Sequence, residues 1–109
     1  MVYQEDLTDY ANQVDSGNFS FVPTGLEAVA NTRLEIHRIL VSAYDVETLI
    51  LKDGTTEKGR LYLGVNGTGG IDYGNKPLKL SAGNAFTLAK VLSASTPISV
   101  MINYKRYPV

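Results

Sequence analysis

The sequence ISVMINY, residues 98–104, carries the clearest β-strand pattern in the chain. Every second residue from Ile98 to Tyr104 is large and apolar or aromatic, while Ser99, Met101 and Asn103 occupy the positions between them. Successive side chains of a strand point to opposite faces. We therefore expect one face of this strand to lie in the core, and the face that includes Met101 to meet solvent or another protein.

The preceding chain contains further short apolar runs, and residues typical of turns separate them. The Asp53-Gly54 pair after the run 46–51 is a strong hairpin signal. Seven or eight strands at spacings of about ten residues are typical of a sandwich or barrel. We predict an all-β fold, an antiparallel β-sandwich or jelly-roll-like barrel, over residues 21–109. The runs are 19–21, 33–43, 46–51, 60–65, 71–73, 78–80, 85–92 and 98–104.

The longest run, residues 33–43, changes phase part-way along. Leu34 and Ile36 share one face of a regular strand, whereas Ile39, Val41 and Ala43 would share the other. A β-bulge near His37-Arg38 would bring both sets to the same side. A helix over 26–40 is the competing interpretation, and the β-branched residues of the later part favour a strand.

Residues 1–20 form a distinct segment, for which we predict an extended or partly helical N-terminal arm. Its apolar residues Tyr3, Leu7, Tyr10 and Val14 follow a helical spacing. Two turns of helix are marginal alone in water, so this segment is either a frayed terminus or an arm that orders against a neighbouring subunit. These four residues and Met101 are the predicted oligomer or capsid interface.

The glycine-rich stretch 64–70 contains four glycines in seven residues, which argues against the interior of an ordinary strand. We expect a loop tip there, and an exposed contact loop that presents Asn66, Thr68 and Tyr73. The stretch lacks the Gly-Lys-Ser/Thr ending of a phosphate-binding loop.

The composition restricts the classes of function. The chain has 109 residues, the size of one domain, and lacks cysteine, which excludes disulfides and thiolate metal sites. A net charge of −1 gives no general attraction to nucleic acid or anionic lipid. No apolar run is long enough to span a membrane, and the acidic N-terminus is unlike a signal peptide. We expect synthesis in a cytoplasm, and neither nucleic-acid nor membrane partners.

Residues that could carry catalysis are sparse. His37 is the single histidine of the chain and lies within a predicted strand, where a residue on the sheet surface is expected. Glu47, Asp53 and Glu57 lie at or near predicted turns, and we expect them to be solvated. The sequence shows neither a metal-binding cluster nor a cofactor motif, and we predict that the protein is not an enzyme.

Three stretches, Ile36–Ala43, Val46–Gly54 and Pro77–Leu88, give the chain a resemblance to known proteins. With their aspartate-glycine hairpin, the sequence Pro77-Leu78-Lys79-Leu80 and the Gly83-Asn84 turn, they resemble small β-sandwich virion proteins of tailed bacteriophages. The resemblance covers roughly residues 33–107. It implies a head decoration or cement protein that binds the outside of the capsid, stabilises the shell, contacts the major capsid protein and forms a homotrimer, without catalytic residues. The alternative is a receptor- or carbohydrate-binding module of a tail fibre or spike.

Overall fold

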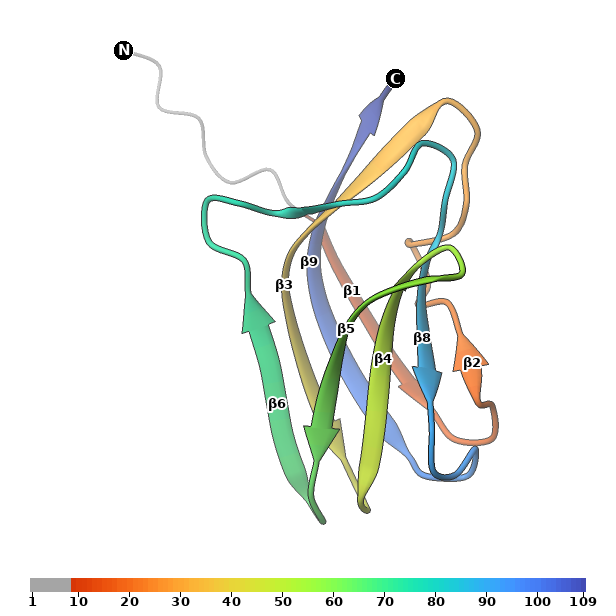
Figure 1. The fold of residues 1–109 in the computed structure, drawn as a ribbon, viewed down its shortest axis with the longest axis vertical. Helices are drawn as coiled ribbons and strands as arrows, with labels where there is room; N and C mark the ends of the chain where they lie inside the picture. The colour runs from red at the N-terminus through yellow and green to blue at the C-terminus, as the bar shows by residue number, and fades with distance from the viewer. Residues whose placement is uncertain (1–8) are drawn as a thin grey trace.

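A computed structural model describes residues 9–109, which form nine β-strands and no helix (Figure 1). The all-β prediction is therefore confirmed. The strands are β1 (Asp9–Asp15), β2 (Ser20–Phe21), β3 (Thr32–Ala43), β4 (Glu47–Asp53), β5 (Thr56–Leu63), β6 (Gly67–Asp72), β7 (Leu78–Lys79), β8 (Phe86–Lys90) and β9 (Ile98–Pro108).

The strands build two antiparallel sheets that face each other (Figure 1). Sheet A has the order β1-β9-β3-β6, with the short β7 also paired to β3, and sheet B has the order β2-β8-β4-β5. Apart from the β4–β5 hairpin and the β6–β7 connection, each link between consecutive strands crosses from one sheet to the other. The eight strands other than the short β7 are connected as in a jelly roll, one of the two architectures expected from the sequence.

The core lies between the two sheets and follows the alternation of β9. Ile98, Val100 and Ile102 are buried, whereas Ser99 and Met101 are exposed, as the sequence predicts. The largest completely buried side chains come from both sheets and from the loops: Leu26, Leu34, Ile36, Ile39, Leu49, Leu51, Leu80, Phe86 and Leu88.

Strand β3 contains the predicted bulge. Its register against β9 shifts between Ile36 and Arg38, so that His37 is the extra residue. Because of this shift, Ile36 before the bulge and Ile39 after it both point into the core. The competing helix over 26–40 is wrong, because β3 begins at Thr32 and Leu26 lies in the loop before it.

The Asp53-Gly54 signal is also confirmed, since Asp53 pairs with Thr56 across a two-residue turn between β4 and β5. Gly54 has a φ of 61°, the positive value that a hairpin turn of the II′ type requires at its first central residue. The carbonyl of Ala85 accepts a hydrogen bond from the Gly54 amide at 2.9 Å. The turn is thereby tied to the start of β8.

The partly helical form of the N-terminal arm is wrong for residues 9–15, which form strand β1. All seven residues pair with β9, from Asp9 opposite Tyr104 to Asp15 opposite Ile98. A partner strand satisfies the backbone of so short a segment, which local helical spacing alone cannot do. Residues 1–8 lie outside the part of the chain that the structure describes.

The loop tip expected over 64–70 is also corrected, because Gly67–Asp72 forms strand β6 beside β3. Gly69 and Gly70 lie where side chains would collide with neighbours. A Cβ at Gly70 would overlap the carbonyl oxygen of Ile39, and one at Gly69 would lie 2.9 Å from Leu63 Cδ2. Glycine here permits a close approach of strands instead of a flexible tip.

Candidate functional site

The outward side of sheet A is the candidate site, and we call it the open face. Within residues 9–109, neither a helix nor a third sheet covers it. The pairing register arranges its side chains in three rows across β1, β9, β3 and β6. The rows are Val14–Ser99–Ser42–Thr68, Asn12–Met101–Leu40–Gly70 and Tyr10–Asn103–Arg38–Asp72.

Strand β1 has its larger apolar residues on the outward side of the sheet, the reverse of an ordinary surface strand. Tyr10 and Val14 point outward and are 61% and 68% exposed. The inward positions carry the small Ala11 and the polar Gln13 and Asp15. A strand on the surface of an isolated domain normally places its larger apolar residues inward. The reversal leaves the larger apolar side chains of β1 on the outside of the sandwich.

The centre of the open face is apolar as well. Met101 pairs with Leu40, and each of the two side chains is 43% exposed. Gly70 is the partner of Leu40 on the other side and has no side chain, and Leu40 Cδ2 lies 3.0 Å from where a Gly70 Cβ would be. Directly opposed and diagonal residues on one sheet face are in contact range. Tyr10, Val14, Met101 and Leu40 thus form one connected apolar area.

Within the three rows, charged residues occur only in the row that contains Arg38 and Asp72, whereas beyond the bulge Glu35 pairs with Lys105 and Lys79. The outward side of sheet B differs, because Lys52 pairs there with Glu57, and Arg60 makes a 2.7 Å ion pair with Glu57. Depletion of charge from the centre of a surface, with polar groups at its margin, is the pattern of protein–protein interfaces. This contrast distinguishes the open face from an ordinary solvated sheet.

One end of the open face is hollowed. Val14, Thr68 and Ser99 line this hollow together with Tyr44 and Asn66 from the adjoining turns. The Asn66 amide donates to the Tyr44 carbonyl at 3.2 Å, which holds the two turns together. Tyr44 is 68% exposed, so an aromatic side chain extends the apolar area to this end of the sandwich.

The structure brings together three of the five predicted interface residues: Tyr10, Val14 and Met101 all lie on the open face. The predictions for Tyr3 and Leu7 fall outside the described residues. Leu40 was missed, although the phase change in 33–43 contains the signal. Once a bulge places Ile39 and Val41 inward, the leucine between them must point outward.

The predicted contact loop is corrected, because its three residues do not share a site. Asn66 lies in the turn before β6, and Thr68 belongs to the open face. Tyr73 is half-buried against the core just after β6, and burial raises its pKa. A six-residue strand spans about 20 Å, so Asn66 and Tyr73 lie at opposite ends of β6.

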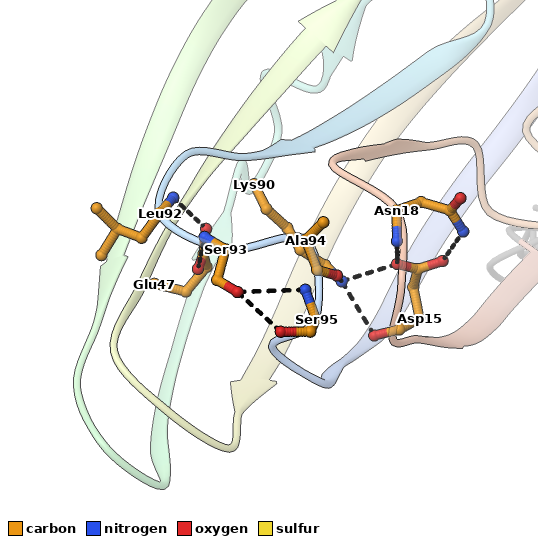
Figure 2. Close-up of polar contacts among 8 residues, drawn as sticks. All are labelled: Asp15, Asn18, Glu47, Lys90, Leu92, Ser93, Ala94 and Ser95. Atoms are coloured by element: carbon orange, nitrogen blue, oxygen red, sulfur yellow. Dashed lines mark hydrogen bonds and ion pairs between the residues drawn. The ribbon is translucent and has the colours of Figure 1, made fainter.

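A buried ion pair fixes the end of β1 (Figure 2). Lys90 Nζ donates to Asp15 Oδ2 at 2.8 Å, and also to the carbonyls of Asp15 at 3.2 Å and Ala94 at 3.0 Å. All three ammonium protons are therefore used. This lysine was not predicted from the sequence, although its phase with Phe86 and Leu88 indicates an inward position.

Two carboxylates expected to be solvated are buried instead, and this expectation is wrong. Glu47 accepts hydrogen bonds from the Leu92 and Ser93 amides at 2.8 and 3.1 Å (Figure 2). Asp53 accepts from the Ser81 amide and hydroxyl and from Asn84 Nδ2. Both residues share the inward phase of β4, and each holds a loop in place. Glu57 is exposed, as expected.

These acids do not form a catalytic pair with each other. Glu47 and Asp53 lie at opposite ends of β4, about 20 Å apart, whereas paired glycosidase carboxylates lie within about 10 Å. His37 is part of the bulge, with Nε2 3.6 Å from Glu35 Oε1. Residues 9–109 contain no group of three or more metal-ligating side chains, and no helix among them is long and apolar enough to cross a membrane.

Comparisons with known proteins find a similar fold among the solved structures. No protein-family model matches the chain, and no curated protein matches its sequence. The fold is similar to a chain in the cryo-EM structure of the virus-like particle of giant freshwater prawn Macrobrachium rosenbergii extra small virus. The TM-score is 0.50 with 14% identity, over 91% of this chain and 75% of that chain. At this identity, the similarity establishes a shared fold.

Proposed function

We propose that this chain is a structural protein of a virus particle and that it attaches to its protein neighbours through the open face. The reversed polarity of β1 is the observation that carries the proposal. The Tyr10 and Val14 side chains are exposed while Asp15, on the inward side, needs Lys90 as a partner. This arrangement costs stability in an isolated domain, and a protein partner that covers the outward side offsets the cost.

The fold supports the same role. Jelly rolls occur in viral capsid proteins, and a solved structure with a similar fold is that of a virus-like particle. Lectin domains also use jelly rolls, so the fold alone does not select the function. The distribution of charge favours a protein partner. A carbohydrate site would need polar groups that converge on one place, and Asn66, Thr68 and Tyr73 are spread along β6 instead.

Within this role, our proposal is decoration of the outer surface of a phage head after synthesis in the host cytoplasm. The major capsid protein is the partner, and the chain associates with itself, as a homotrimer by the resemblance. Such a protein stabilises the shell because it binds only the assembled lattice, and linked copies gain from multivalency. The proposed role requires no catalysis, cofactor, nucleic acid or membrane.

Co-sedimentation with capsids tests the proposal. The wild-type chain is expected to pellet with mature heads and to remain in the supernatant without them. Leu40→Lys places a charge at the centre of the apolar area and is expected to abolish pelleting. Tyr62→Lys is the matched control, because Tyr62 is 78% exposed on the outward side of sheet B. Equal binding by both variants would overturn the assignment of the open face.

Electron microscopy of the purified chain separates decoration from shell formation. A decoration protein stays dispersed until it meets a capsid. If this chain alone formed closed particles, it would still be a structural protein of a virus particle. The proposal that it decorates the outside of another shell would then be wrong.

A further inference from the structure

Strand β1 is an unprotected sheet edge. Within residues 9–109 its only strand partner is β9, so the backbone groups on its other side are not used in a ladder. Proteins usually protect such edges with lysine and other charged side chains, inward-pointing charges, proline, bulges or very short strands. Strand β1 has seven residues, contains neither lysine nor proline, and pairs with β9 without a register shift. Its inward-pointing Asp15 is already neutralised by Lys90 within the same chain.

The edge strands β2, β5 and β6 are less suited to accept another strand. Strand β2 is only two residues long. Strand β5 contains the charged residues Glu57, Lys58 and Arg60, and its register with β4 is interrupted by a bulge. Strand β6 is half glycine, and glycine offers no side chain for cross-strand packing. The contrast makes β1 the edge best suited to accept another strand.

We propose that β1 pairs antiparallel with β1 of a second copy of this chain, so that sheet A continues across a two-fold axis at Asn12. The sequence of β1 is complementary to itself in this register. Tyr10 lies opposite Val14 of the second copy, an aromatic–β-branched pair of the kind that stabilises antiparallel strands. The two Asn12 side chains face each other and can exchange amide hydrogen bonds.

The inward side of this register is also compatible. Ala11 lies opposite Gln13 of the second copy. Asp15 lies opposite Asp9, and because Lys90 neutralises the Asp15 charge, this pair does not oppose two unpaired like charges. On the outward side of the joined sheets, the two open faces form one continuous surface. The proposed contact rests on the proposed function and specifies how copies of the chain are linked. A two-fold contact combines with a three-fold one in dihedral assemblies, which have an even number of subunits.

A disulfide test is direct because the chain contains no cysteine. Opposed residues of antiparallel strands have Cα atoms about 4.5–5.5 Å apart, within the range that a disulfide requires. Asn12→Cys is therefore expected to form covalent dimers under mild oxidation. The expected rate is about 100-fold above that of the collision control Tyr62→Cys, because pre-positioned thiols have a millimolar effective concentration. Ser42→Cys, on the open face but two strands away from the β1 edge, reports stacking of faces.

Charge exchange at the same position gives a second measurement. Asn12→Lys places like charges opposite each other, as does Asn12→Glu, and each variant alone is expected to lose the two-fold contact. An equimolar mixture is expected to recover it as a heterodimer, measured by light scattering. Circular dichroism confirms that each variant is folded, since Asn12 is exposed.

The result that overturns the proposal is Asn12→Cys cross-linking no faster than Tyr62→Cys, with no recovery on mixing the charged variants. Faster cross-linking of Ser42→Cys than of Asn12→Cys also overturns it, in favour of face-to-face stacking. The Leu40→Lys variant, combined with Asn12→Cys, is expected to cross-link as before while it no longer binds capsids. Failure of the β1 contact and failure of the proposed function are therefore distinguishable.

Discussion

Lys90 Nζ lies 2.8 Å from Asp15 Oδ2, and this ion pair joins the last residue of β8 in sheet B to the last residue of β1 in sheet A. The lysine side chain is completely buried and the aspartate side chain is 8% exposed. Burial of two charges is tolerated because hydrogen bonds satisfy both groups. The pair thus fastens the strand that carries Tyr10 and Val14 to the opposite sheet.

Replacement of Lys90 by methionine is expected to lower the free energy of unfolding by about 3–5 kcal/mol, because Asp15 would remain as an uncompensated buried charge. The midpoint of urea unfolding measures this change. The double variant Lys90→Met/Asp15→Leu removes both charges and is expected to recover part of the loss. An unchanged midpoint for the single variant would show that the pair does not stabilise the fold.

The stability contributed by Asp15 is expected to depend on pH. Burial alone raises the pKa of this carboxyl, but hydrogen bonds from Lys90 and Asn18 and the Lys90 charge outweigh it and lower the pKa. The folded pKa is therefore below the unfolded one. The contribution is complete above the unfolded pKa and is lost as pH falls through the folded pKa.

Asp15→Asn removes this titration and is the control for the pH effect. The difference in unfolding free energy between wild type and Asp15→Asn is expected to be larger at about pH 7 than at about pH 3. Urea titrations at the two pH values measure it. A constant difference would mean that the carboxyl has the same pKa in both states.

Gly70→Ala is expected to destabilise the protein by about 1–3 kcal/mol, since the added Cβ would overlap the Ile39 carbonyl and push β6 away from β3. Gly64→Ala is the control, because a Cβ at Gly64 would meet nothing within 4 Å and the φ of this residue is not positive. Thermal unfolding compares the two. Similar melting temperatures would argue against a close approach of the strands at Gly70.

Glu47→Ala is expected to lower the free energy of unfolding by about 1.5–3 kcal/mol, typical of lost hydrogen bonds to a charged group. The variant leaves the Leu92 and Ser93 amides without their acceptor and loosens the loop between β8 and β9. Hydrogen exchange at these two amides measures the local effect. Glu57→Ala changes an exposed carboxylate and is expected to leave both amides protected.

The sequence predicts the parts of the fold whose side-chain pattern serves the core. The alternation of apolar residues in 98–104 and the change of phase at His37 both follow from which side chains are buried. The sequence alone therefore locates β9 and the bulge in β3. Strand β1 could not be recognised in this way. Tyr10 and Val14 are four residues apart, which imitates a helical stripe, and they point outward, so the usual relation between apolar residues and the core does not hold.

The remaining errors concern contacts between residues distant in sequence. The glycines of β6 resemble a flexible loop until the backbone of Ile39 is seen beside Gly70. Glu47 looks like a solvated acid at a turn because its hydrogen-bond donors lie 45 and 46 residues further along the chain. The open face itself was only half predicted: Met101 followed from strand alternation, whereas its neighbour Leu40 required the register of β3 against β9.

The central place of β9 in sheet A has a consequence for biosynthesis. β9 is the last of the nine strands to emerge from the ribosome, yet it lies between β1 and β3 and pairs with both. Strand β1, the first of the nine to be made, therefore cannot pair until its partner strand, about 90 residues downstream, has been synthesised. Sheet A closes only once β9 has emerged, so a shorter nascent chain cannot present the complete surface to a neighbour.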